Sequence, residues 1–475
     1  MIGASPPLSS LLHEEPSIDA LNALRLGVSS VGNHEFDQGA AELTRMQRGG
    51  CHPQDGCAGG VAFAGARFQY LAANVIRSGG QGSPQTLFPP TAVRKIGGVR
   101  IGFIGEVLQG TPTIVRPSGV AGLTFREEAD TANRYAAELK RQGVNAIVLL
   151  IHKGATPAQP PDRGDPNTCE GLHETAGQSF LPMLERLTPD IKVVISAHTH
   201  QAYNCTIGGR LVTSAASNGR VITRITLTID RATDSIVEAR AHNDIVTREV
   251  PKDPAETAIL DRYRPLVTAR TERVVGTVTA PLLRQRSPSG EFPLGDVIAD
   301  AQLAFANAAG DRAELGFMNP GGVRADITGE HDAGARRGEV TYGDVLVVQP
   351  FGNIVEAATM SGEMIRQVLE QQFHADGSST ILQVTDGFTY TYRRNAAAGA
   401  HVIAESMMLH GRQLTPDMRV RVSTMNFLLD GGDGFPVFLK ATDRQSYGPD
   451  ADALAAYIAA HSPVAPPPAA RITAQ

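Results

Sequence analysis

The chain has 475 residues, 42% of them hydrophobic, and its 43 Lys+Arg and 49 Asp+Glu leave a net charge of −6. At roughly 150 residues per domain, this length predicts two to four domains with a substantial core. The nearly balanced charge argues against a nucleic-acid partner, which would need a basic surface. No apolar run approaches the roughly 18–20 residues that cross a bilayer, so we expect no membrane span.

The first 250 residues alternate short strand-like runs with helical stretches. Apolar, β-branched runs occupy residues 28–31, 100–107, 145–154 and 192–200. Residues 125–141, between the second and third runs, have the spacing of a helix. Continuous apolar runs separated by helices are typical of strands buried on both faces, so a layered α/β domain is predicted over residues 1–250.

The pattern changes after residue 230. Asp253-Pro254 provides an N-cap followed by proline at the first helical position, which predicts a linker helix within residues 251–273. A strand, a helix and hairpin signals follow, so a second domain is predicted over residues 274–445. Residues 446–475 are expected to hold a last helix and a disordered Pro/Ala tail.

The four cysteines suggest two disulfides. The Cys51–Cys57 segment is rich in Gly and polar residues, which favours a short closed loop, and Cys169 and Cys205 could form a second pair. Free buried thiols are the alternative. Two disulfides would indicate an oxidising compartment, yet the first residues lack the charged and apolar regions of a signal peptide. Either the chain is cytoplasmic or its true start lies upstream.

Three of the predicted strands in the first half end in possible metal ligands. Asn33 and His34 follow the first, His152 ends the second, and His198 and His200 end the third. Ligands gather beyond the carboxyl ends of strands in α/β sheets, so these three clusters point to one place. Imidazole suits zinc and similar ions, and the Asn carbonyl adds an oxygen donor. One histidine alone is more often structural, but the coincidence predicts a metal site.

These motifs carry a resemblance. GNHEFD, a strand ending in His, and SAHTH, in this order, resemble the calcineurin-like metallophosphoesterases. In the second half, NPGGVR, PFGN and NFLLDGGDGF resemble the C-terminal domain of the 5'-nucleotidase family. Together they resemble bacterial bifunctional metallophosphatase/5'-nucleotidase enzymes over about residues 2–440. The resemblance implies a metallophosphoesterase β-sandwich flanked by helices, incomplete at its N-terminus, joined by a helix to an α+β domain.

The resemblance implies two divalent metal ions, zinc, manganese or similar, bridged by an aspartate and a hydroxide that attacks phosphorus in line. By matching motifs, Asn33, His152 and His198 would hold one ion and His200 the other. His34 and Asp37 resemble the family's catalytic pair, in which the carboxylate orients a ring that stabilises phosphate oxygens. The alternative is that His34 only caps a helix near Asp37.

The second half is expected to hold the nucleoside. Phe351 and Phe427 match the two aromatics that sandwich the base in relatives, although Phe351 could equally be a core residue. Asp433 is placed to accept hydrogen bonds from ribose hydroxyls, but Asp-Gly is also a common turn. Asn319 and Arg324 flank a Gly-Gly pair that lets the backbone approach a ligand.

Arg284 and Arg286 are further candidates for the phosphate, on a gapped match to the family. The sequence also departs from the family at its start. The Asp-x-His motif is absent, and so is the Gly-Asp motif that supplies the bridging aspartate, while MIGASPPLSSLL resembles the family's segment just after that aspartate. We expect either an internal methionine taken as the start or a shortened, inactive homologue. One metal site is therefore expected to be incomplete.

The expected activity is metal-dependent hydrolysis of nucleoside 5'-monophosphates, with 2',3'-cyclic nucleotides as further substrates. One alternative is a catalytically impaired nucleotide-binding homologue. Another is a phosphoesterase for a different substrate, such as a nucleotide sugar. The expected partner is a nucleotide, without nucleic acid, and the resemblance implies a periplasmic or secreted location. The sequence does not indicate base preference, the native metal or the oligomeric state.

Overall fold

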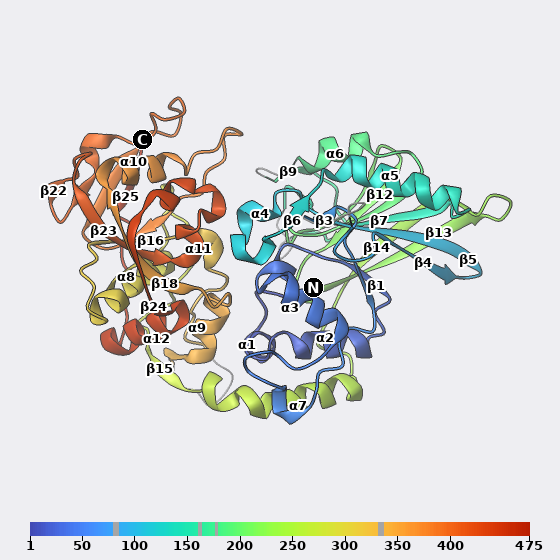
Figure 1. The fold of residues 1–475 in the computed structure, drawn as a ribbon, viewed down its shortest axis with the longest axis horizontal. Coiled ribbons are helices and arrows are strands. Elements are labelled where there is room, and N and C mark those ends of the chain that lie inside the picture. Colours follow the sequence, from blue (N-terminus) through green and yellow to red (C-terminus); the bar gives the residue numbers. More distant parts are fainter. Residues whose placement is uncertain (79–84, 160–163, 176–178, 331–336) are drawn as a thin grey trace. The chain divides into compact units, whose positions relative to one another are not determined.

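The computed structural model in Figure 1 describes residues 1–78, 85–159, 164–175, 179–330 and 337–475. They form two compact units. Unit one comprises Met1–Ile2 and Glu15–Leu260, and unit two comprises Gly3–Glu14 and Asp261–Gln475. Helix α7 (Pro254–Thr271) crosses from one unit to the next along the chain and falls within the range predicted for a linker helix. No helix of the described ranges is both long and apolar enough to cross a membrane.

Unit one is built on a six-stranded sheet in the order β11-β12-β10-β7-β5-β4. Its strands are β4 (Thr91–Ile96), β5 (Val99–Val107), β7 (Ala146–His152), β10 (Ile191–Ser196), β11 (Ala202–Ile207) and β12 (Arg210–Ala215). The four inner strands are parallel, and the two edge strands are antiparallel to their neighbours. Three of the four apolar runs of the sequence, at 100–107, 145–154 and 192–200, correspond to the inner strands β5, β7 and β10, which are apolar because a parallel sheet is covered on both faces. The run at 28–31 forms a strand outside this sheet, and the inner strand β12 was not predicted.

Each face of this sheet has its own cover. Helices α5 (Glu128–Arg141) and α6 (Phe180–Arg186) pack on one face, where Ile104 and Leu149 are fully buried. The hairpin of β13 (Val221–Asp230) and β14 (Ser235–Ile245) packs on the other face, over residues such as Val193. The layered α/β architecture predicted from the sequence is thus confirmed.

Short elements surround the carboxyl ends of the inner strands. Strand β1 (Val28–Ser30) pairs in parallel with β2 (Gln69–Leu71). The helices α2 (Glu15–Ala23) and α3 (Gly39–Arg48) belong to the same region, and a third core cluster that includes Phe36 and Tyr70 lies beneath them.

The disulfide hypothesis holds, and the free-thiol alternative does not. Cys51 pairs with Cys57, six residues apart, and Cys169 pairs with Cys205, 36 residues apart. The structure contains no free cysteine among its described residues, and these four are all the cysteines of the chain. Both bridges lie in unit one.

Unit two is an α+β unit centred on a five-stranded sheet in the order β19-β16-β23-β18-β24. Its strands are β16 (Leu315–Met318), β18 (Ile354–Ser361), β19 (Gln383–Val384), β23 (Arg419–Met425) and β24 (Thr442–Pro449). Helices α8 (Pro293–Ala308) and α12 (Asp450–His461) pack together on it (Figure 1). Buried side chains of these helices and of the sheet pack together in the largest apolar core within the described residues.

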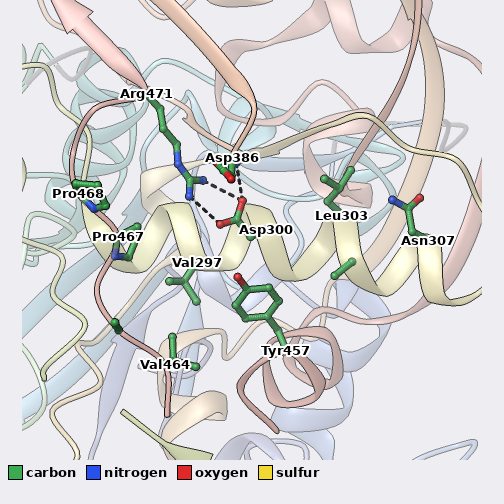
Figure 2. A pocket seen from close by; sticks show the side chains of 12 residues that line it. Val297, Asp300, Leu303, Asn307, Asp386, Tyr457, Val464, Pro467, Pro468 and Arg471 are labelled. Carbon is green, nitrogen blue, oxygen red and sulfur yellow. Dashed lines mark hydrogen bonds and ion pairs between the residues drawn. The ribbon is translucent and has the colours of Figure 1, made fainter. Parts of the chain in front are cut away.

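The expectation of a disordered C-terminal tail is wrong. Strand β25 (Ile472–Ala474) pairs in parallel with β20 (Phe388–Tyr392). Figure 2 shows the reason: Arg471 donates to both carboxylate oxygens of Asp300 on α8, at 2.8–2.9 Å. The chain between α12 and β25 closes one side of a cavity of about 460 Å³ against α8. A charged anchor and a strand partner, neither visible in local composition, order this segment.

Candidate active site

Three strand ends of unit one meet at the side chain of Asn33. Asn33 follows β1, His152 is the last residue of β7, and His198 follows β10. The amide oxygen of Asn33 lies 3.0 Å from His152 Nε2 and 3.0 Å from His198 Nδ1. An amide oxygen only accepts hydrogen bonds, so both ring nitrogens donate to it. Two imidazoles and an amide oxygen therefore converge on one point.

The loop after β10 holds its histidines in a strained backbone. His198 and His200 both have left-handed φ angles, of 73° and 57°. This conformation costs a residue other than glycine about 1–3 kcal/mol and persists only where the surrounding structure enforces it. One enforcing contact is the Thr199 hydroxyl, which donates to the Ala155 carbonyl at 3.0 Å. Such strain is concentrated at functional loops, and here it carries two of the predicted metal ligands.

The electrostatics around His152 keep its ring neutral. Burial lowers the pKa of His152 well below its usual value of 6.5, and the nearby His198, His34 and His200 lower it further. A neutral imidazole carries one proton, which can sit on either ring nitrogen, so in its other tautomer the nitrogen that faces Asn33 offers a lone pair to a metal ion. Because His198, His34 and His200 each act electrostatically on His152, the four histidines lie near one another in unit one.

The chemistry of these donors fits a divalent metal ion of the first transition row. Imidazole nitrogens suit zinc and manganese-like ions, and an amide oxygen is an accepted hard ligand. Asn33, His152 and His198 could hold one such ion, with His200 available to a second. All four donors are uncharged, so this set by itself supplies no negative charge to balance two cations.

His34 and Asp37 form a second feature beside the metal-ligand candidates. His34 Nδ1 lies 2.8 Å from Asp37 Oδ2, and the two side chains are 22% and 17% exposed. His34 is the first residue of the short 3-10 helix η1 (His34–Phe36), and the side chain at the N-cap position makes no capping hydrogen bond. The Asp37 carboxylate therefore fixes the orientation of the His34 ring.

Glu35 is a site residue that the sequence analysis did not single out. Its buried carboxylate accepts a hydrogen bond from the Gly32 backbone N–H at 2.8 Å and closes the turn that presents Asn33. A side chain at Gly32 is excluded, because a Cβ there would lie 2.8 Å from the His152 ring. The Gly-x-x-Glu spacing in GNHEFD is the signal that could have revealed this role.

Unit two brings two of its candidates into direct contact. Asn319 Nδ2 donates to Asp433 Oδ2 at 2.5 Å, across 114 residues of sequence. Burial raises the pKa of Asp433, while the Asn319 amide and the Arg324 and His374 side chains oppose the rise. Asp433 has a left-handed φ of 53°, and a Cβ on Gly321 would lie 3.3 Å from its carboxylate. The backbone of the Gly-Gly turn thus approaches this carboxylate closely.

The aromatic and basic candidates surround that pair. The Arg324 guanidinium lies over the Phe351 ring at 5.7 Å, and Phe427 packs against Gly432, next to Asp433. Both phenylalanines are half-buried, unlike the fully buried Phe317 and Phe435 of the core. Phe427 also packs against the apolar core of unit two, so its position fits both a base-stacking role and a core role.

The two weaker arginine candidates differ in their surroundings. Arg284 Nη1 donates to the Arg324 carbonyl at 3.0 Å, so Arg284 joins the group around Asp433. Arg286 makes no hydrogen bond or ion pair within the described residues, and desolvation and the neighbouring Arg284 cation lower its pKa. The structure does not bring Arg286 into contact with the other candidates. His374, an electrostatic neighbour of Asp433, is a site residue that no motif in the sequence indicated.

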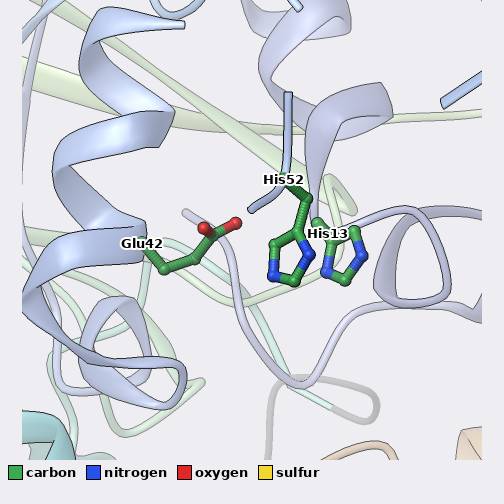
Figure 3. Close-up of side chains that lie close together, drawn as sticks. All are labelled: His13, Glu42 and His52. Carbon is green, nitrogen blue, oxygen red and sulfur yellow. The ribbon is translucent and has the colours of Figure 1, made fainter. Parts of the chain in front are cut away.

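One further group of side chains resembles a metal site but does not form one within a unit. Figure 3 shows Glu42 and His52, which belong to unit one, with His13, which belongs to unit two. The Glu42 carboxylate is already held by the Arg45 guanidinium at 2.7–3.1 Å. His52 Nδ1 in turn accepts a hydrogen bond from the Asp55 backbone N–H at 3.1 Å, so no metal site is assigned here.

Comparison with known proteins identifies relatives of the sequence and of the fold. The model of the 5'-nucleotidase, C-terminal domain, family matches residues 274–440. The cell wall protein Lmo0130 of Listeria monocytogenes is 31% identical, over 96% of this chain and 59% of that protein. The endonuclease YhcR of Bacillus subtilis is 29% identical, over 90% of this chain and 32% of that protein. The chain thus spans less than two thirds of these two relatives.

Solved structures show the same architecture. The 5'-nucleotidase precursor from Thermus thermophilus matches with a TM-score of 0.77 and 25% identity, over 99% of this chain and 87% of that one. The described residues thus share the two-unit fold of this 5'-nucleotidase precursor. Residues 274–440, which lie in unit two, match the family model of the 5'-nucleotidase C-terminal domain, and the chain is similar in fold to a 5'-nucleotidase precursor over nearly its whole length.

Proposed function

We propose that this chain hydrolyses nucleoside 5'-monophosphates in a metal-dependent reaction. The observation that carries the proposal is the convergence of His152 and His198 on Asn33, at 3.0 Å each. This donor set lies on a chain whose second half belongs to the 5'-nucleotidase C-terminal family. A bound divalent ion would neutralise phosphate charge and supply hydroxide near neutral pH.

The residues of unit one have separate roles in this proposal. Asn33, His152 and His198 hold the first ion, and His200 contributes to the second. His34 carries a proton or positive charge at Nε2 toward the phosphate oxygens or the leaving oxygen, because Asp37 holds Nδ1 at 2.8 Å. The strained loop after β10 fixes its two histidines before substrate arrives, so little reorganisation is needed.

Unit two supplies recognition of the nucleoside. Phe351 and Phe427 stack on the base, which accepts purines and pyrimidines because every base has a π-face. Asp433 accepts hydrogen bonds from ribose hydroxyls, and Arg324 and Arg284 bind phosphate oxygens. The Asn319 side-chain oxygen supports a ligand here, since it is buried without a hydrogen-bond partner in the described part of the chain. A buried acceptor of this kind is costly unless a donor reaches it.

The proposal is tested by phosphate release from AMP, UMP, 2',3'-cyclic AMP, UDP-glucose and a generic aryl phosphate. The full chain is assayed with Mn²⁺ or Zn²⁺ and after chelation. We expect metal-dependent release from the 5'-monophosphates, and its loss in His152→Ala. Preference for UDP-glucose would instead make the chain a phosphoesterase for nucleotide sugars. Metal-independent release, or release from the aryl phosphate alone, would contradict the proposal.

The uncharged donor set favours one second candidate, a nucleotide-binding homologue with impaired catalysis. Four neutral donors hold two cations weakly, because their mutual repulsion is not balanced by a carboxylate. Calorimetric binding of AMP without turnover, at saturating metal, would identify this case. The two disulfides support a location in an oxidising compartment, as in a periplasmic or secreted protein, for either candidate.

A further inference from the structure

A buried ion pair involves the residue that follows the candidate metal ligand His152 in the chain. Lys153, the next residue, is 7% exposed, and its ammonium donates to Glu128 Oε1 at 3.0 Å. Glu128 is 2% exposed. Desolvating two charges is expensive, and a well-packed apolar pair in their place is often as stable or more so. A pair like this one is therefore weak evidence for stability and points to a positional role.

Glu128 joins three elements through one carboxylate oxygen. It lies in the first turn of α5, and the same Oε1 that binds Lys153 also accepts from the Gln109 backbone N–H at 2.8 Å. Gln109 comes just after β5, and Lys153 just after β7. The carboxyl ends of two neighbouring parallel strands are thus tied to one helix N-terminus.

These ties lie next to the backbone of His152. Val107 of β5 is the register partner of His152, and the Leu108 N–H donates to the His152 carbonyl at 3.3 Å. The two hydrogen bonds to Glu128 come from Gln109 and Lys153, which follow Leu108 and His152 in the chain. Movement of either strand end would therefore shift the imidazole away from Asn33, whose oxygen is 3.0 Å from Nε2.

Glu106 completes a buried cluster of charged residues. It is fully buried on β5, and neither carboxylate oxygen has a hydrogen-bond partner within the described residues. Burial raises its pKa well above the usual value; Glu128 and Glu127 add to the rise, and Lys153 opposes it. The Lys153 ammonium thus bonds to Glu128 and not to Glu106.

We propose that the Glu128–Lys153 pair positions His152, and that both are positioning residues for the metal site. The proposal rests on the proposed function, in which His152 holds a metal ion. A partner that orients a metal ligand typically changes metal affinity by 10–100-fold when it is removed. Neither residue contacts substrate in this proposal, so their effect reaches the reaction only through the ring.

The test compares the full chain with Lys153→Met, Glu128→Gln and the double variant Lys153→Met/Glu128→Met. Co²⁺ affinity is measured by calorimetry and by the visible spectrum of the bound ion, and Tm by calorimetry. We expect at least tenfold weaker Co²⁺ binding in all three variants. The double variant should recover Tm, since it leaves no unpaired buried charge, without recovering affinity. Affinity that follows Tm back to the wild-type value would overturn the proposal.

A metal-free measurement separates this proposal from the proposed function. Nitrogen-15 NMR of the imidazoles reports whether His152 keeps its proton on Nε2, facing Asn33. We expect the wild-type signal to change in the single variants, whatever the AMP activity of the chain. An unchanged His152 signal would overturn the positioning role even in an active enzyme.

The chain contains a matched control on the same helix. Lys140 of α5 pairs with Asp190 at 2.7 Å, with the two side chains 44% and 36% exposed. Lys140→Met removes a Lys–carboxylate pair of similar geometry away from the strand ends. We expect it to leave Co²⁺ affinity and the His152 signal unchanged. A loss equal to that of Lys153→Met would mean that any change in α5 disturbs the site.

Discussion

At the scale of single residues, the site depends on side chains whose partners are already in place. Asp37 orients His34, Asn33 receives two ring N–H groups, and Asn319 fixes Asp433. Preorganisation of this kind lowers the cost of binding and of reaction, because the groups need not be ordered when substrate arrives.

His34→Ala is expected to lower kcat by roughly 10²–10⁴-fold while changing KM little, because the ring is assigned to the transition state. Steady-state kinetics with AMP measures the split. His34 is partly exposed and outside the core, so Tm should stay close to that of the wild type. An effect confined to KM would reassign His34 to substrate binding.

Phe427→Leu is expected to lower kcat/KM for AMP and UMP alike, by about 5–100-fold, and to spare the aryl phosphate. Loss of base stacking accounts for about 1–3 kcal/mol, and leucine keeps most of the apolar volume. Kinetics with the three substrates decides the matter. A parallel fall for all three, or a lower Tm with unchanged kinetics, would place Phe427 in the core.

The stability of the metal-free chain should fall as pH drops below about 6.5, the usual pKa of histidine. Burial depresses the folded-state pKa of His152, so the unfolded chain binds the proton more readily. The contribution of His152 to the free energy of unfolding is therefore fully present above about pH 6.5 and is lost as the pH falls below that value. Urea unfolding between pH 5 and 8 measures it, with His152→Gln as the comparison. An equal pH slope in the variant would exclude His152 as the source.

At the scale of elements, the largest departure from sequence-based expectation is the C-terminal segment. Proline- and alanine-rich composition is typical of disorder, because such residues bury little apolar surface. Here the segment returns to α8 and ends as β25, with Arg471 bound to Asp300 and its own N–H bonded to Glu291.

Arg471→Met is expected to lower the free energy of unfolding by about 1.5–3 kcal/mol, the range for hydrogen bonds to charged groups. The loss leaves the Asp300 carboxylate without its cation, and β25 should open locally. Urea unfolding measures the first effect, and hydrogen exchange at Ile472–Ala474 the second. Arg412→Met, at an exposed position, is the control. Unchanged exchange in β25 would show that strand pairing alone holds the segment.

At the scale of the whole molecule, the chain combines a unit that carries the proposed metal site with a unit that matches the 5'-nucleotidase C-terminal domain model, each with its own core. The two disulfides are confined to unit one. A disulfide stabilises a protein mainly by restraining the unfolded chain, and this effect grows slowly with the length of the loop that it closes.

Removal of Cys169–Cys205 by paired alanine substitution should cost about 4 kcal/mol, and removal of Cys51–Cys57 about 2 kcal/mol. These values follow from chain entropy for loops of 36 and 6 residues. Thermal unfolding of the oxidised wild type and the two variants measures the difference. A larger loss for the short loop would indicate a role in native packing.

The sequence alone determined the elements and the kinds of chemistry. Apolar β-branched runs specify buried strands through local periodicity, Asp253-Pro254 specifies a helix start, and the ordered histidine motifs predict metal chemistry at strand ends. These signals are local, so they can be read without the fold. They also set the fold class, because alternating strands and helices have few ways to pack.

Only the tertiary structure decided which distant side chains meet. The contact of Asn319 with Asp433, and the single oxygen of Glu128 that serves both Gln109 and Lys153, join positions far apart in the chain. The C-terminal anchor at Arg471 has the same origin. Each of these contacts depends on the order of the strands and on loops that bring distant segments together, and no local pattern encodes either. Burial then strengthens the contacts, because hydrogen bonds and ion pairs are stronger in the protein interior than at the surface.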